Sequence, residues 1–314
     1  MSSASMFSTV EMAPRDPILG LNEQFNADTN PNKVNLGVGV YFDDTGKLPL
    51  LKCVQSAEAT MAAAPKPRGY LPIDGIVAYD AGVKALVFGA DSEPVKSGRV
   101  ATVQAIGGTG GLKIGADFLK KLNPNAKVLI SDPSWENHQA LFTNAGFKVE
   151  TYRYYDAATR GLNVDGMLAD LKAAPAGTIA LLHACCHNPT GYDITAAQWD
   201  QVVAICKNND LVPFLDMAYQ GFGYGLKEDG AVIQKFVDAG LTFFVSTSFS
   251  KSFSLYGERV GALSVLCTDK AEADRVLSQL KIAIRTNYSN PPTHGGSVVA
   301  AVLGNPELRK QWED

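Results

Sequence analysis

The sequence has few cysteines, no long apolar run and no cluster of positive charge. Its five cysteines are an odd number in 314 residues, and Cys185 and Cys186 are adjacent. This pattern suits reduced thiols, so we expect a cytoplasmic protein and not a disulfide-stabilised secreted one. Residues 1–11 lack the charged and apolar regions of a secretion signal, and no apolar stretch reaches the length of a membrane span.

Charge and hydrophobic content narrow the class of protein further. The 28 Lys and Arg residues against 32 Asp and Glu residues give a net charge of −4. We therefore expect neither a nucleic-acid nor a membrane partner, and small anions must be held by a few well-placed cations. Hydrophobic residues make up 46% and charged residues 19% of the chain. These proportions are typical of a globular protein with a sizeable core and argue against disorder or a coiled coil.

From Arg99 onward, short β-rich runs alternate with helical patterns. This alternation predicts a mainly parallel sheet covered on both faces, with the ligand site at the carboxyl ends of the strands. We expect strands at Val100–Ile106, Ala126–Ser131, Phe147–Tyr154, Thr178–His183, Val212–Leu215, Thr242–Thr247 and Gly261–Leu266. We expect helices at Gly111–Leu122, Glu136–Ala145, Asp165–Ala173, Ala196–Asn208 and Ala231–Ala239.

The two ends of the chain follow a different pattern. Residues 1–17 are irregular, and Val34–Tyr41 is expected to be extended ahead of a helix over Leu51–Ala64. Ser297–Leu303 and Pro306–Asp314 both have helical patterns, separated at Gly304-Asn305. The second helix has no glycine cap, as expected of an interrupted helix, so we expect the chain to stop before a C-terminal segment.

Polar groups follow four successive predicted strands. A lone lysine in a serine-rich loop is usually a solvated surface residue, but here other polar groups are expected at the same edge of the sheet. The strand ends deliver a glycine-rich turn before a helix, a side-chain amide, a carboxylate with a phenol, and a lysine with an arginine close behind. These groups are Gly107–Gly111, Asn188, Asp216 with Tyr219, and Lys251 with Arg259.

Each of these groups meets a requirement of pyridoxal phosphate. A phosphate needs backbone N–H groups at a helix start and a guanidinium, and the pyridine nitrogen needs an anion to stay protonated. The phenolate oxygen needs hydrogen-bond donors, and only an amine forms a reversible imine with the aldehyde. The matching residues are Gly108, Thr109 and Arg259 for the phosphate, Asp216 for the nitrogen, Tyr219 and Asn188 for the oxygen, and Lys251 for the imine.

The segment Ser248–Gly261 resembles the lysine motif of the class I pyridoxal-phosphate-dependent aminotransferases. Further matches run from Ala13–Pro17 to Asn287–Pro292, so the resemblance to aspartate and aromatic aminotransferases covers nearly the whole chain. It implies an α/β fold of the fold-type I transferase class, with a mainly parallel, seven-stranded mixed sheet between helices. The implied domains are an arm at 1–14, the N-terminal part of a small domain at 15–48, and a large domain at 49–314, with the C-terminal part of the small domain absent.

The resemblance also implies roles for single residues. Lys251 is implied to form the Schiff base and to shuttle the α-proton, and Trp135 to stack on the cofactor ring. Gly39 is implied to let the substrate approach the backbone, and the peptide bonds before Pro133 and Pro189 to be cis. The implied cofactor-binding residues are Tyr70, Gly108, Thr109, Trp135, Asn188, Asp216, Tyr219, Ser248, Ser250, Lys251 and Arg259; the implied substrate-binding residues are Gly39, Phe42, Leu48, Trp135, Asn188 and Arg285.

The resemblance implies a homodimer with shared active sites. Tyr70 is expected to reach the phosphate of the neighbouring subunit, and Arg285 to grip a substrate's distal carboxylate across the same interface. The family binds the α-carboxylate with an arginine in a C-terminal segment, which lies beyond the last residue, Asp314. Because that contact orients the Cα–H bond, we expect its absence to cripple turnover even when cofactor binds.

The substrate indications are mixed. Arg285 favours a dicarboxylate, with 2-oxoglutarate as amino acceptor, and Thr109 and Asn290 match the aspartate type. Phe42 and Leu48 are apolar where aspartate-specific relatives tend to be polar, which favours an aromatic side chain. We therefore predict activity on both aromatic amino acids and dicarboxylates, with a strict aspartate aminotransferase as the alternative.

Four rival hypotheses stay open. His183, Cys185, Cys186 and His187 supply metal-ligand types, but packing at a strand end explains them better, and we predict no metal site. The glycine-rich turn before a helix could hold a nucleotide, yet it lacks the P-loop ending and the dinucleotide spacing. The third hypothesis is another reaction of the same cofactor, and the fourth is an inactive protein that only dimerises.

Overall fold

The computed structural model describes residues 5–16, 19–35, 37 and 39–314, and it divides into two compact units, Met1–Pro49 and Leu50–Asp314. In the described part of Met1–Pro49 there is one short helix, α1 (Leu19–Ala27), among turns and irregular segments. The predicted extended stretch Val34–Tyr41 includes residues 36 and 38, which lie outside the described residues, and its described residues form no strand. Several large apolar side chains of this unit are exposed: Met6, Phe7, Val10, Met12, Leu21, Val34, Tyr41, Phe42 and Leu48.

Leu50–Asp314 is built on a seven-stranded sheet of order β1-β9-β8-β7-β6-β2-β3. β9 pairs antiparallel with both β1 and β8, and the remaining neighbours are parallel, which confirms the predicted mixed sheet. The strands are β1 (Val100–Ile106), β2 (Lys127–Asp132), β3 (Lys148–Arg153), β6 (Ile179–His183), β7 (Val212–Met217), β8 (Phe243–Ser248) and β9 (Val260–Leu266). All seven lie within two residues of the predicted bounds. A short hairpin, β4 (Tyr155–Asp156) with β5 (Gly161–Leu162), was not predicted.

Helices cover both faces of this sheet. They are α2 (Lys52–Ala63), α3 (Val77–Lys84) with the π-helical turn η1 (Ala85–Gly89), α4 (Glu93–Lys96), α5 (Gly107–Leu122), α6 (Glu136–Asn144), α7 (Val164–Ala173), α8 (Ala196–Asn208), α9 (Leu226–Asp229), α10 (Ala231–Asp238), α11 (Lys270–Asn287), α12 (His294–Gly304) and α13 (Pro306–Glu313), with the 3₁₀ turn η2 (Tyr256–Glu258) before β9. Among the described residues, no helix combines the length and apolar character that crossing a bilayer requires.

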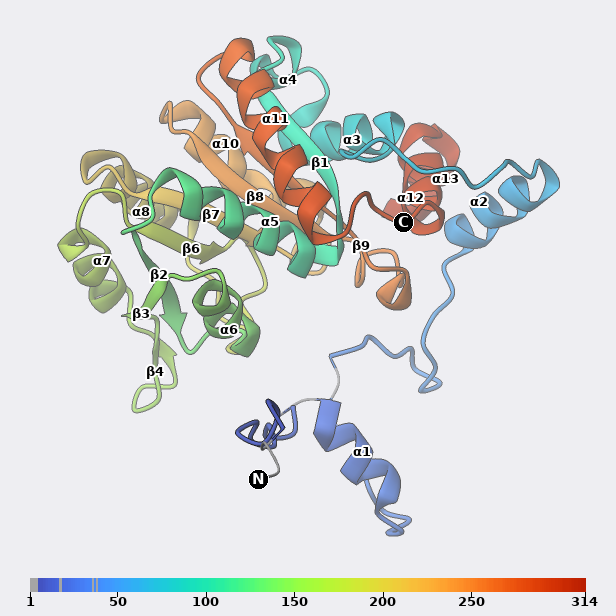
Figure 1. Ribbon diagram of the computed structural model, residues 1–314, viewed down its shortest axis with the longest axis horizontal. Coiled ribbons are helices and arrows are strands. Elements are labelled where there is room, and N and C mark those ends of the chain that lie inside the picture. Colours follow the sequence, from blue (N-terminus) through green and yellow to red (C-terminus); the bar gives the residue numbers. More distant parts are fainter. Residues whose placement is uncertain (1–4, 17–18, 36, 38) are drawn as a thin grey trace. The chain divides into compact units, whose positions relative to one another are not determined.

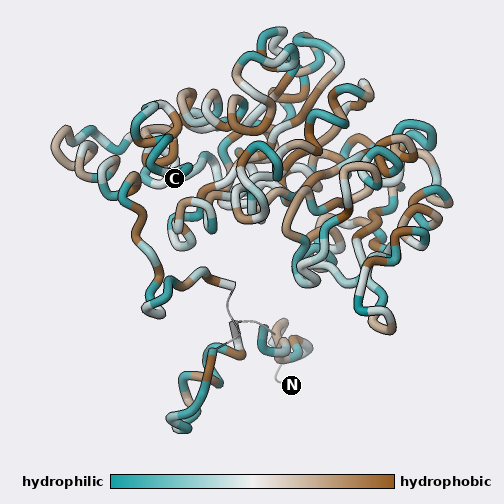
Figure 2. Tube along the Cα trace, turned by 180° about the vertical axis from the view of Figure 1, so that it is seen from behind, coloured by the Kyte–Doolittle hydropathy of each residue, from teal (hydrophilic) through white to brown (hydrophobic). Residues whose placement is uncertain are grey.

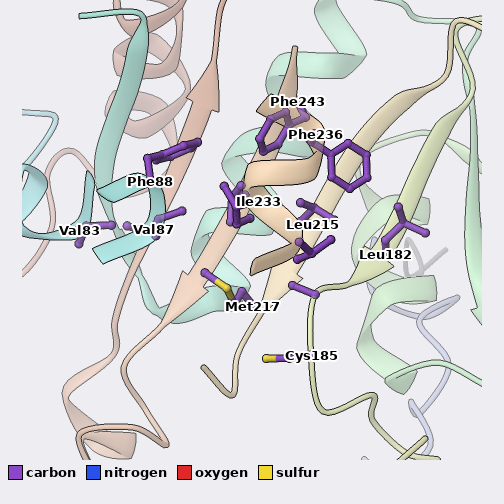
Figure 3. Close-up of a cluster of buried hydrophobic side chains, with 14 of the residues drawn as sticks. Val83, Val87, Phe88, Leu182, Cys185, Leu215, Met217, Ile233, Phe236 and Phe243 are labelled. Atoms are coloured by element: carbon purple, nitrogen blue, oxygen red, sulfur yellow. The ribbon is translucent and has the colours of Figure 1, made fainter. Parts of the chain in front are cut away.

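Two hydrophobic cores lie on opposite faces of the sheet. One joins α5, α6 and α11 to alternate strand residues such as Val103 and Phe214; the other joins α3, α7, α8, α10 and α12 to their neighbours, such as Leu215. Figure 3 shows Phe236 of α10 and Phe243 of β8 within the second core. Burying one such side chain contributes about 1.5–3 kcal/mol. Figure 2 shows hydrophobic and hydrophilic residues alternating along the helices, as a helix with one buried face requires.

Local capping explains where several helices begin. Thr195 and Gln198 form a reciprocal capping box at the start of α8, whose predicted bounds are confirmed without change. Asn305 accepts hydrogen bonds from the backbone of Glu307 and Leu308 at the start of α13, so the predicted break between the last two helices is also confirmed. The 18-residue helix α11 was not predicted, although Asp269 caps it in the same way.

Candidate active site

The candidate site lies where β6, β7 and β8 end side by side. In the sheet His183 is paired with Asp216, and Asp216 with Ser246, so the loops that follow these strands start from one edge. The turn with Lys251 follows β8 directly, and α5 begins at Gly107, the residue after the end of β1. The geometry therefore places the lysine, carboxylate and glycine-rich segments at the predicted carboxyl edge of the sheet.

Lys251 is partly buried, and its amine lies 5.0 Å from the centroid of the Tyr219 ring. Burial lowers the pKa of Lys251, the negative charge of Asp216 opposes that change, and the positive charge of Arg259 adds to it. The lowered pKa increases the fraction of neutral amine at a given pH. Lys251 is thus suited both to attack a carbonyl carbon and to transfer protons.

Asp216 has a buried carboxylate group that is in hydrogen-bond contact with His138. It is 8% exposed, and its Oδ2 lies 2.9 Å from Nε2 of the fully buried His138. The Ser134 hydroxyl lies 2.9 Å from Nδ1 of His138 and 3.3 Å from Nε2 of His183. Burial, followed by the neighbouring histidines, holds the pKa of His183 well below its usual value. The carboxylate is therefore fixed by a chain of side-chain contacts that runs into the core.

A second histidine fixes the turn that carries Asn188. The His187 ring stacks on Tyr154 at 3.9 Å, and its two nitrogens lie 2.8 Å from the hydroxyls of Ser131 and Thr190. Burial lowers the pKa of His187 to about 4, so the ring is neutral at ordinary pH. The hydrogen bond from Asn188 lowers the pKa of Tyr219, but burial and Asp216 outweigh it and the net pKa is raised. Tyr219 therefore stays protonated and can donate a hydrogen bond.

The start of α5 forms an anion-binding cradle with the lysine loop. Gly107, at φ 66°, has no room for a side chain, because a Cβ there would lie 2.5 Å from Nη2 of Arg259. A Cβ on Gly108 would lie 3.1 Å from Cβ of Ser248. Nη1 of Arg259 donates to the Ser250 hydroxyl at 3.2 Å. Backbone N–H groups of the first helical turn, two hydroxyls and a guanidinium thus lie close together, and these are groups that could hold a phosphate.

Comparison with known proteins gives the family. Residues 31–314 match the sequence pattern of "Aminotransferase class I and II". The chain belongs to this family. It is 64% identical to the aspartate aminotransferase of Pseudomonas aeruginosa over 309 residues and 52% identical to the aromatic-amino-acid aminotransferase of Escherichia coli over 308 residues. Each match covers 98% of the chain and 78% of the relative.

Solved structures agree with this assignment. The aromatic-amino-acid aminotransferase of Burkholderia pseudomallei, covalently bound to pyridoxal phosphate, superposes with a TM-score of 0.96 at 66% identity, over 98% of this chain and 77% of that one. The cytoplasmic aspartate aminotransferase of Saccharomyces cerevisiae has a TM-score of 0.95 at 37% identity, over 99% of this chain and 78% of that one. The chain is thus an aminotransferase of the fold-type I class, and its cofactor is pyridoxal phosphate, which the lysine, the buried carboxylate and the anion cradle fit.

The other predicted site residues of the aminotransferase differ in their position and exposure. Trp135 precedes α6, and its ring meets His138 edge-on at 5.1 Å. Tyr70 is 94% exposed, and Arg285 is exposed, with Nη1 donating to the Ser289 hydroxyl at 2.8 Å. Gly39, Phe42 and Leu48 belong to Met1–Pro49, a different unit from the one that holds Lys251.

Two further features of the aminotransferase bear on the sequence-based expectations. The peptide bonds Asp132–Pro133 and Asn188–Pro189 are both cis, as predicted. The four ligands of the rival metal hypothesis are not assembled in the described part of the aminotransferase. The rings of His183 and His187 contact serine and threonine hydroxyls, whereas both thiols lie beside Asp229.

Sequence reasoning missed the histidine and serine behind Asp216. His138 and Asp216 are 78 residues apart, and only the packing of α6 against the strand ends brings them together. The available indication was local: Ser134 follows a strand end, and His138 follows Ser134 by one helical turn.

Proposed function

We propose that this aminotransferase exchanges the amino group between 2-oxoglutarate and two classes of L-amino acid, aromatic and dicarboxylic, with Lys251 carrying the cofactor. The observation that supports this most directly is the meeting of the Lys251 amine, the buried Asp216 and the α5 cradle at one edge of the sheet. Relatives at 64%, 52% and 50% identity are called aspartate, aromatic-amino-acid and tyrosine aminotransferase. This range of names fits a broad specificity.

When bound, pyridoxal phosphate supplies a sink for the electrons that an amino acid releases on losing its α-proton. Asp216 keeps a proton on the ring nitrogen, and His138 holds that carboxylate in place through the 2.9 Å contact. Tyr219 and Asn188 donate hydrogen bonds to the phenolic oxygen. Gly108, Thr109, Ser248, Ser250 and Arg259 bind the phosphate, and Trp135 stacks on the ring.

Lys251 also moves the α-proton in this proposal. Its lowered pKa increases the fraction of neutral amine, so Nζ of Lys251 would accept the α-proton of the substrate and later give it up. The protons therefore move within the site and are not lost to solvent.

The substrate-binding residues are proposed to come from other parts of the protein. Residues 15–48 would be part of the small domain, with Gly39, Phe42 and Leu48 facing the substrate. In a homodimer, Tyr70 would contact the neighbouring subunit's phosphate and Arg285 the distal carboxylate of its substrate. Their exposure in the single chain is compatible with such a role. We also propose a cytoplasmic location, since all five cysteines are free thiols.

Borohydride reduction tests the proposal directly. Reduction of the cofactor-loaded chain should fix the cofactor irreversibly onto Lys251, as read by peptide mass spectrometry. Lys251→Ala should lose the label, and Lys270→Ala, at an exposed ion pair with Asp274, should keep it. Label on a different lysine of the unsubstituted chain would disprove the assignment. Turnover of phenylalanine and aspartate, measured with the chain extended to the length of its relatives, then tests the two substrate classes.

A further inference from the structure

The adjacent thiols Cys185 and Cys186 belong to a cluster that the proposed reaction does not use. Their sulfur atoms and one carboxylate oxygen of Asp229 all lie within 4.8 Å of one another. Among the described residues, no other three Cys, His, Asp or Glu side chains come together in this way. Cys185 is buried, and Cys186 is partly exposed, so the cluster has one open side.

The backbone brings the two neighbouring thiols together. Cys186 has a left-handed conformation with φ 50°, and the Asp193 carboxylate accepts hydrogen bonds from the N–H groups of Cys186 and His187 at 2.7 and 2.8 Å. This turn lets side chains that would alternate along a strand share one side.

Asp229 is held rigidly on the other side of the cluster. Its Oδ2 accepts hydrogen bonds from the N–H groups of Gly221 and Gly223 at 2.8 and 2.9 Å, and its Oδ1 from that of Tyr224 at 2.9 Å. The Cys186 sulfur also lies 3.9 Å from the carbonyl oxygen of Tyr219. Two sulfurs and a fixed carboxylate therefore lie together, with a carbonyl oxygen beside the Cys186 sulfur.

We propose that Cys185, Cys186 and Asp229 form a binding site for a thiophilic divalent cation of the zinc type. Thiolate sulfur is the ligand that separates such cations from Mg²⁺ and Ca²⁺, and a carboxylate oxygen completes three positions of a tetrahedron. Sulfur atoms around one zinc ion lie about 3.8 Å apart at Zn–S distances of ~2.3 Å. The two sulfurs, which lie within 4.8 Å of each other, must therefore approach by at most about 1 Å. Binding forms two metal–sulfur bonds and releases both thiol protons to solvent.

The site lies next to residues that the cofactor needs. Cys186 is two residues before Asn188, and the carbonyl of Tyr219 belongs to the residue whose phenol faces Lys251. A cation that draws the sulfurs and the carbonyl together shifts both Asn188 and Tyr219. We therefore expect bound cation to slow cofactor loading and turnover, and a chelator to reverse the effect.

Cadmium titration is the test, because its thiolate complexes absorb in the ultraviolet. The metal-free, cofactor-loaded chain should bind one Cd²⁺ and gain the thiolate band, and excess Mg²⁺ should not compete. Cys186→Ser should abolish the band. Asp229→Asn should weaken cation binding at least about tenfold. Its single amide oxygen can still take the place of Oδ2 and accept the hydrogen bonds from Gly221 and Gly223. Cys206→Ser, at a buried thiol of α8, should behave like the unsubstituted chain.

Each outcome decides the proposal. Retention of the band in Cys186→Ser, its loss in Cys206→Ser, or the absence of any stoichiometric band would overturn the site. Cofactor absorbance and circular dichroism show whether each variant is folded. Zn²⁺ that inhibits the unsubstituted chain but not Cys186→Ser would support the link to the cofactor site, and equal inhibition of both would disprove it.

Discussion

The residues proposed to hold the cofactor and those proposed to select the substrate differ in their surroundings. Asp216 is 8% exposed and His138 is fully buried, each with a defined hydrogen-bond partner, whereas Phe42 and Leu48 are 53% and 47% exposed. The cofactor site is thus prepared by the packing of one unit before any ligand arrives, which is how electrostatic catalysis is made efficient. In our proposal, substrate choice depends on side chains that are about half exposed.

Removing the amine should have the largest effect. Lys251→Ala eliminates both the covalent attachment of the cofactor and the proton carrier, so we expect kcat to fall by at least about 10⁴-fold with either substrate class. Cofactor binding, followed by fluorescence, should survive because the cradle and Asp216 are intact. Lys270→Ala is the matched control. A loss smaller than tenfold would show that the buried site does not set the chemistry.

Disturbing the support behind the carboxylate should have an intermediate effect. His138→Gln removes the 2.9 Å contact to Asp216, and loss of such supporting contacts costs about 10–100-fold. The decrease should appear in kcat, with a shifted pH titration of the bound cofactor's absorbance. His294→Gln, at a partly exposed pair with Glu58, is the control.

A double-mutant cycle can distinguish whether His138 positions the Asp216 carboxylate or only stabilises the fold. Because His138 acts through Asp216, adding His138→Gln to Asp216→Asn should cost much less than it does alone. Additive losses in kcat would mean that His138 supports the fold independently of the carboxylate.

Whether a contact in the candidate site could be predicted from the sequence depends on what brings its two residues together. Lys251 and Gly108 follow strands and Asp216 lies near the end of β7, so their convergence is predictable from topology alone. The contact of His138 with Asp216 depends on how α6 packs, which no local pattern encodes. α11 is a different case: Leu280, Ala283 and Ile284 are buried at helical spacing, and Asp269 caps the helix, so a closer reading of periodicity would have found it.

Changes among the exposed residues should alter preference and leave the chemistry intact. Phe42→Lys with Leu48→Thr makes the surroundings of the substrate more polar, and apolar pocket contacts are worth about 1–3 kcal/mol. We expect the ratio of kcat/KM for phenylalanine to that for aspartate to fall about tenfold, with the absorbance of the bound cofactor unchanged. The same double substitution at exposed Leu21 and Val34, to Thr and Lys, is the control. An unchanged ratio would remove Phe42 and Leu48 from the specificity argument.

The smallest effect should be a shift in the titration of Lys251 itself. Its neutral amine, the reactive form, predominates above a pKa that burial and Arg259 lower and Asp216 raises. Arg259→Gln should therefore raise the midpoint at which Lys251 becomes reactive as pH increases, and Asp216→Asn should lower it. At a fixed pH below the midpoint, the first variant reacts more slowly and the second faster. The measurement is the rate of acylation of Lys251 in cofactor-free chain by mass spectrometry, with exposed Lys66 as internal reference. Shifts in the same direction for both variants would mean that the substitutions act by changing burial, and that the two charges do not control the amine.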